Sequence, residues 1–119
     1  MTTIREHAAT PEDLTRLFVA RANAGDVDGL ADLYEPDAVL AYPPGSTTVG
    51  RTAIRAVFET MLAHVPRFEP EQPLPTVRAG DLALTSTQSA DHTGTRVQVV
   101  RRQPDGTWLR VIDRPETVG

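Results

Sequence analysis

The hydrophobic pattern of this 119-residue chain changes character near Pro66, and that change constrains the fold most. Up to Val65, apolar residues recur at the three- and four-residue spacing of amphipathic helices. Beyond Pro66, Thr, Val and Gln alternate with small or apolar residues, and turn signals recur at short intervals. A helical half followed by a meander of strands predicts an α+β fold, with helices packed on one face of a mostly antiparallel sheet.

Three helices are expected in the first half of the chain. The first covers residues 10–24, because Thr10 can cap it and Pro11 suits the first helical position. The second covers residues 26–34, and the third, which has the most regular period, covers residues 51–65. Residues 1–9 are expected to be a flexible segment at the start of a single domain that spans residues 1–119.

Strands are expected between the last two helices and throughout the second half. The first covers residues 38–42 and ends in a loop at Pro43-Pro44-Gly45. The others cover residues 67–71, 74–79, 82–91, 95–103 and 107–114. Three prolines within residues 69–75 indicate an edge or irregular strand there.

Composition excludes several classes of function. A net charge of -4, without a basic cluster beside aromatic residues, argues against nucleic acid as a partner. The chain has no cysteine, so disulfides, thiolate nucleophiles and cysteine-held metals are excluded. Its three histidines show no metal-ligand spacing, and we expect no metal and no cofactor. No apolar run is long enough to span a membrane and no signal peptide is visible, so we expect a cytoplasmic protein.

Four short motifs, each at an element boundary, occur in a set order: Gly25-Asp26, Tyr34-x-x-Asp37-Ala38, Gly50-Arg51 and Asp105-Gly106-x-Trp108. Together they resemble the nuclear-transport-factor-2-like superfamily, close to its SnoaL-like and ketosteroid-isomerase-like bacterial members, and the resemblance extends over roughly residues 11–115. The resemblance implies a cystatin-like α+β cone, in which three helices pack on a strongly curved sheet around a ligand-sized cavity. The fold hosts isomerases, dehydratases, cyclases, hydrolases and binding modules, so it implies no single activity.

Ketosteroid isomerase chemistry needs a carboxylate base and two oxyanion donors. The resemblance places Tyr42 at the position of the base, and Phe18 and Gln98 at the positions of the two donors. A phenylalanine has no donor, and a tyrosine is not a base at neutral pH. We therefore predict that the chain is not a ketosteroid isomerase.

Strand alternation then predicts the cavity wall, because residues two apart share a face. On the last strand the resemblance turns Leu109, Val111 and Asp113 inward and Trp108 outward. On the strand at residues 82–91 it turns Leu84 and its neighbours at two-residue spacing inward. The predicted ligand-binding residues are those expected to face the cavity: Phe18, Tyr34, Phe58, Leu62, Ser86, Gln88, Arg96, Gln98 and Val111.

Asp113 and Tyr42 are the candidates for catalysis. A carboxylate in a half-apolar cavity can act as a general acid or base, although Asp113 could instead form an ion pair with Arg96 or Arg114. Tyr42 could donate a hydrogen bond to a ligand, or pack its ring and find a backbone partner.

Two functions therefore remain open. One is a domain that binds a small, partly apolar, oxygenated molecule, and the other is a cofactor-free isomerase, cyclase, dehydratase or hydrolase. A purely structural dimerisation domain would need side chains to fill the cavity. The outer sheet face carries Val97, Val99 and, on this alternation, Trp108, and it is predicted to form a homodimer.

Overall fold

The computed structural model describes residues 5–65, 67–88 and 94–117, and it confirms the α+β prediction. The helices are α1 (Asp13–Asn23), α2 (Val27–Ala31) and α3 (Arg51–His64). The strands are β1 (Tyr34–Leu40), β2 (Thr48–Val49), β3 (Gln72–Pro73), β4 (Val77–Ala79), β5 (Leu82–Gln88), β6 (Thr95–Arg102) and β7 (Trp108–Thr117).

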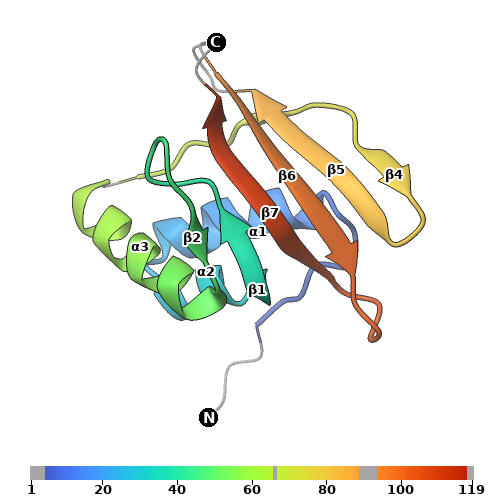
Figure 1. Cartoon of the computed structure of the whole chain (residues 1–119), viewed down its shortest axis with the longest axis horizontal. Helices are drawn as coiled ribbons and strands as arrows, with labels where there is room; N and C mark the ends of the chain where they lie inside the picture. The colour runs from blue at the N-terminus through green and yellow to red at the C-terminus, as the bar shows by residue number, and fades with distance from the viewer. Residues whose placement is uncertain (1–4, 66, 89–93, 118–119) are drawn as a thin grey trace.

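These strands form one sheet in the order β2-β1-β7-β6-β5-β3, with β4 also paired to β5. Strand β1 runs parallel to β7, and the other described pairs are antiparallel. Figure 1 shows the long strands β5, β6 and β7 side by side, with α1 passing behind β7 and α3 lying beside β1 and β2. The helices thus cover one face of the sheet and leave the other open.

The core lies between the helices and the inner face of the sheet. Its members are the side chains that folding removes from water. The largest of them are Leu14, Leu17, Leu30, Leu33, Tyr34, Leu40, Ile54, Phe58, Val100 and Trp108. Ile54 and Phe58 stand one turn apart on α3, so a single helix face supplies both.

Several boundaries differ from the sequence prediction for local reasons. The second helix ends at Ala31, and Tyr34 begins strand β1, which starts four residues earlier than expected. Residues 67–71 form no strand, and the proline-rich stretch contributes only the two-residue β3. Residues 5–9, expected to be flexible, pack on the fold: Ala8 is buried and its carbonyl accepts a hydrogen bond from the Trp108 amide at 3.0 Å.

A β-bulge in β7 corrects the expected orientation of that strand. Val99 pairs with Ile112, but the next residue, Val100, pairs with Arg110, so Val111 is the extra residue. An extra residue reverses the alternation on one side of it. Asp113 therefore faces inward as predicted, whereas Trp108, at 2% exposure, is buried and not on the outer face, and Val111 is displaced from the inner row.

Strand β5 also presents the opposite face from the one predicted. Thr85 pairs with Gln98 and Thr87 with Arg96, so these two threonines lie on the inner face. Both are buried, while Leu84 is 40% exposed on the outer face and shares that face with Ser86 and Gln88. The resemblance implied an inward position for Leu84, but Thr85 and Thr87 point inward instead, and their hydroxyls donate to Gln98 and Glu71.

Replacing Ile54 with alanine should destabilise the protein by about 2–5 kcal/mol, because the residue is fully buried and the lost methyl groups leave a cavity. The matched control is Thr52→Ala, at an exposed position of the same helix, which should change the free energy of unfolding by less than about 0.5 kcal/mol. Urea denaturation measures both. Equal effects of the two substitutions would contradict the packing described.

Candidate functional site

A cavity of about 1010 Å³ opens between the helices and the inner face of the sheet. Helices α1 and α3, the β1–β2 loop, the segment after α3 and strands β5, β6 and β7 all contribute to its wall. Its apolar wall includes Phe18, Leu40, Val57, Phe58, Met61 and Phe68. The rings of Phe18 and Phe58 meet edge to face with their centroids 5.5 Å apart. The volume and the apolar lining are typical of small-molecule sites.

Three buried polar side chains are joined below this cavity: Arg110 and Asp113, which form its floor, and Tyr34 behind them. The hydroxyl of Tyr34 donates to Oδ2 of Asp113, and Nη1 of Arg110 donates to the Tyr34 hydroxyl at 3.2 Å. The same Nη1 lies 3.5 Å from Oδ2 of Asp113. All three side chains are buried. The ion pair considered for Asp113 therefore exists, but its partner is Arg110 rather than Arg96 or Arg114.

Burial and charge shift the ionisation of this cluster. Burial, and next the charge of Asp113, raise the pKa of Tyr34 well above that of an exposed tyrosine. Burial opposes the charged form of Arg110, but Tyr34 and Asp113 outweigh it and raise the pKa of its guanidinium. Tyr34 thus stays a neutral donor and Arg110 a cation at physiological pH.

Two buried atoms of the cluster have no hydrogen-bond partner among the described residues: Oδ1 of Asp113 and Nε of Arg110. Buried polar atoms in native proteins are almost always satisfied, so such atoms point to a water or a ligand group. Asp113 and Arg110 both line the cavity. A buried carboxylate oxygen without a protein partner therefore lies at the cavity floor.

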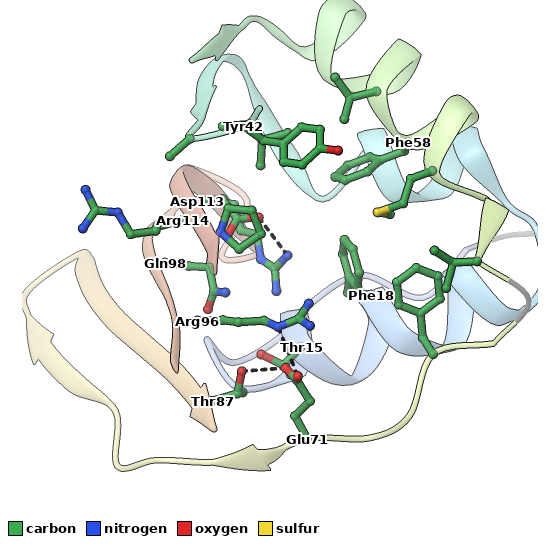
Figure 2. A pocket seen from close by; sticks show the side chains of 18 of the residues that line it. Thr15, Phe18, Tyr42, Phe58, Glu71, Thr87, Arg96, Gln98, Asp113 and Arg114 are labelled. Atoms are coloured by element: carbon green, nitrogen blue, oxygen red, sulfur yellow. Dashed lines mark hydrogen bonds and ion pairs between the residues drawn. The ribbon is translucent and has the colours of Figure 1, made fainter. Parts of the chain in front are cut away.

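A second polar group lies higher on the wall, on β5 and β6. The Thr87 hydroxyl donates to Oε1 of Glu71 at 2.9 Å, and Oε2 of Glu71 lies 3.1 Å from Nε of Arg96. Beside it, the Thr85 hydroxyl donates to Oε1 of Gln98 at 2.8 Å. Figure 2 shows the amide nitrogen of Gln98 turned toward the interior of the cavity.

Six of the predicted site residues line the cavity: Phe18, Tyr42, Phe58, Arg96, Gln98 and Asp113. Five others do not form part of the lining: Tyr34, Leu62, Ser86, Gln88 and Val111. Tyr34 lies behind Asp113, Leu62 packs against the core, and the last three follow the strand corrections given above. Tyr42 is 46% exposed and lies at the cavity rim, where its backbone carbonyl accepts a hydrogen bond from Thr48.

Sequence reasoning missed Arg110, Thr87 and Glu71. Arg110 precedes Asp113 by three residues, which places the two on opposite faces of a regular strand, and the bulge could not be read from the residues. A signal for it existed, since an arginine within an otherwise apolar strand needs a countercharge nearby. Glu71 lies in the proline-rich stretch, where no register could be assigned.

Neither a metal-ligand cluster nor a membrane-spanning helix is present in the described part of the chain. Within residues 5–65, 67–88 and 94–117, no three His, Asp or Glu side chains gather as metal ligands would. No helix in these ranges has the length and apolar character needed to cross a bilayer.

The profile of the SnoaL-like domain family matches residues 15–114. The chain belongs to the SnoaL-like domain family. The resemblance to nuclear-transport-factor-2-like proteins is thereby confirmed. No curated protein matches this SnoaL-like chain.

Solved structures share the fold of this SnoaL-like domain. A Thiobacillus denitrificans protein described as a calcium/calmodulin-dependent protein kinase type II association domain has a TM-score of 0.75 at 22% identity, covering 93% of this chain and 98% of its own. A ketosteroid isomerase-like protein from Erwinia carotovora atroseptica has a TM-score of 0.74 at 18% identity, covering 98% of this chain and 100% of its own. A nuclear-transport-factor-2-like protein with a cystatin-like fold from Novosphingobium aromaticivorans has a TM-score of 0.66 at 20% identity, covering 89% of this chain and 77% of its own. At these identities the likeness confirms the cystatin-like cone and does not extend to activity.

The buried cluster predicts how the protein responds to alkali. The sequence has two tyrosines, no lysine and no cysteine, so tyrosines are the side chains that titrate between about pH 9 and 12. Folding raises the pKa of Tyr34, so its contribution to stability is complete below about pH 10 and is lost as the pH rises further. In the Tyr42→Phe variant, tyrosinate absorbance should appear well above pH 10, together with loss of the folded circular dichroism spectrum.

The control is Tyr34→Phe, which makes the same chemical change at the buried position and leaves Tyr42 as the reporter. In this variant the free energy of unfolding should fall less steeply above about pH 10 than in Tyr42→Phe, because no buried tyrosine remains to ionise. Ionisation of the remaining tyrosine of Tyr42→Phe near pH 10, with the fold intact, would contradict the buried cluster.

Proposed function

We propose that the cavity binds a small, partly apolar, oxygenated organic molecule that donates a hydrogen bond to Oδ1 of Asp113. The observation that carries this proposal is the unpartnered Oδ1 in a wall that is otherwise largely apolar. Such a site gains affinity from the apolar contacts and selectivity from the polar one. A ligand hydroxyl would satisfy an atom that is costly to leave buried and unpaired.

Because Arg110 is the countercharge of Asp113, a neutral ligand group is favoured beside Oδ1 of Asp113. Arg110 already neutralises the carboxylate, and Tyr34 already occupies its other oxygen. A cation is therefore not required, and a second anion would be repelled. An alcohol, a phenol or an N–H group fits the remaining acceptor.

A cofactor-free enzyme is the second candidate. It is favoured by the presence of both Asp113 and Tyr42 on one cavity, where the free Oδ1 could take a proton from a bound molecule. Binding alone requires fewer assumptions, because Tyr42 is 46% exposed at the rim. The exclusion of ketosteroid isomerase and the cytoplasmic location both stay predictions.

The binding proposal predicts that the protein distinguishes 2-naphthol from naphthalene, which differ by one hydroxyl. Wild-type protein should bind 2-naphthol roughly tenfold more tightly or better, since a hydrogen bond to a charged acceptor contributes about 1.5–3 kcal/mol. Isothermal titration or protein-observed NMR measures both affinities. Equal affinity for the two compounds would sink the proposed role of Oδ1.

The Asp113→Asn variant should reduce this discrimination. Its control is Asp37→Asn, at an exposed carboxylate outside the cavity lining, which should leave both affinities unchanged. Circular dichroism checks that each variant is folded before the titrations are compared.

We also propose that the open face of the sheet forms a homodimer. Successive cross-strand partners make an apolar stripe over six strands: Val77, Leu84, Val99, Ile112, Val39 and Val49. Ile112 at its centre is 47% exposed, and Val97 lies beside it on the same face as Val99. An apolar patch of this extent is unusual on a monomer, and a two-fold axis lets one patch cover its own copy. A structural relative is itself described as an association domain.

The dimer proposal predicts that wild-type protein sediments at twice its chain mass of 12.9 kDa. Ile112→Arg should shift it to the monomer, because the interface would then bury two unpaired charges about the two-fold axis. The control is Ala56→Arg, at an exposed position on α3. Analytical ultracentrifugation measures the mass, and a monomeric wild type at micromolar concentration would refute the proposal.

A further inference from the structure

Glu71 holds the Arg96 side chain at its Nε atom, so that the two terminal nitrogens of the guanidinium point into the cavity. Oε2 of Glu71 lies 3.1 Å from Nε, the atom nearest the base of the guanidinium. Oε1 of the same Glu71 accepts from Thr87, which is the cross-strand partner of Arg96. Figure 2 shows the guanidinium reaching into the cavity between Gln98 and Glu71. Its two terminal nitrogens therefore present a pair of parallel donors to the space.

The charge on the described part of the wall does not oppose an anion. Four arginines line the cavity, Arg67, Arg96, Arg110 and Arg114, against three carboxylates, Glu69, Glu71 and Asp113. Arg114 points away from the cavity in Figure 2, so the remaining charges balance there, although the whole chain carries -4. Each of the three carboxylates lies within 3.5 Å of an arginine nitrogen, so none is left uncompensated to repel an anion.

The two polar groups proposed to meet the ligand, Arg96 and Asp113, lie at different levels along the strands. Arg96 and Gln98 are two residues apart on β6, which separates them by about 7 Å. Gln98 is the cross-strand partner of Asp113, so Asp113 belongs to the second level. The rings of Phe18 and Phe58 line the same cavity. This arrangement suits a flat apolar body with one polar group at each end.

We infer that the ligand is a hydroxy acid with an aromatic or alicyclic body. Its carboxylate forms paired hydrogen bonds with the terminal nitrogens of Arg96, and its hydroxyl donates to Oδ1 of Asp113. The inference rests on the proposed function, since it takes the same cavity and the same acceptor and adds the anionic end.

Four probes test the two ends separately: naphthalene, 2-naphthol, 2-naphthoate and 6-hydroxy-2-naphthoate. Their affinities for the wild-type protein are measured by isothermal titration at pH 7. The carboxylate should tighten binding roughly tenfold or more, in the comparison of 6-hydroxy-2-naphthoate with 2-naphthol, because it meets a charged paired donor.

Three variants assign that gain to one residue. Arg96→Gln should abolish the advantage of the carboxylate while leaving the affinity for 2-naphthol unchanged. Arg96→Lys keeps the charge but not the paired donors, and should retain part of the advantage. The control is Arg102→Gln, at an exposed arginine of the same strand that lies outside the cavity lining, and it should keep the full advantage.

The results separate this inference from the proposed function. If 2-naphthol binds better than naphthalene but the carboxylate adds nothing, or its gain survives in Arg96→Gln, the hydroxy acid inference is overturned and the binding proposal stands. If 2-naphthol shows no preference over naphthalene, the acceptor role of Asp113 fails, and the hydroxy acid inference fails with it. A carboxylate gain that Arg96→Gln removes, together with a hydroxyl gain that Asp113→Asn reduces, supports both.

Discussion

Two opposite charges, Arg110 and Asp113, lie buried three residues apart on one strand of this fold. A regular strand would turn them to opposite faces, and the bulge at Val111 brings both to the inner one. Moving charges out of water is costly, so each depends on the other, and removing either partner of such a pair costs about 3–5 kcal/mol. The position of Tyr34 follows from the same strand, because β1 pairs in parallel with β7 and sets Tyr34 opposite Arg110.

This buried pair explains why the cavity has a polar floor without a net charge there. Arg110 and Tyr34 share Oδ2 of Asp113, and Arg110 also lies over the ring of Phe18, with its guanidinium carbon 5.0 Å from the ring centroid. One cluster thus links β1, β7 and α1 and leaves one carboxylate oxygen for a ligand. Higher on the wall, Thr87 is satisfied within the protein by Glu71, and the Thr85 hydroxyl donates to Gln98.

The sequence allowed the helices, the cone and the inward position of Asp113 to be predicted, since these depend on hydrophobic period and on motifs at element boundaries. It did not reveal the faces of β5 and β7. Leu84, expected inside, lies outside, and Trp108, expected outside, is buried, because the pairing of Thr87 with Arg96 and the bulge decide which way the two strands face. Pairing registers depend on contacts between distant segments, and a local pattern does not contain them.

The ligand site depends on an open cavity with the unpartnered oxygen of Asp113 at its floor. A high-resolution crystal structure would show whether this arrangement exists. We expect an ordered water or ligand atom within hydrogen-bonding distance of Oδ1, with Tyr34 and Arg110 on Oδ2. Side chains filling the cavity, or a protein group bonded to Oδ1, would contradict it.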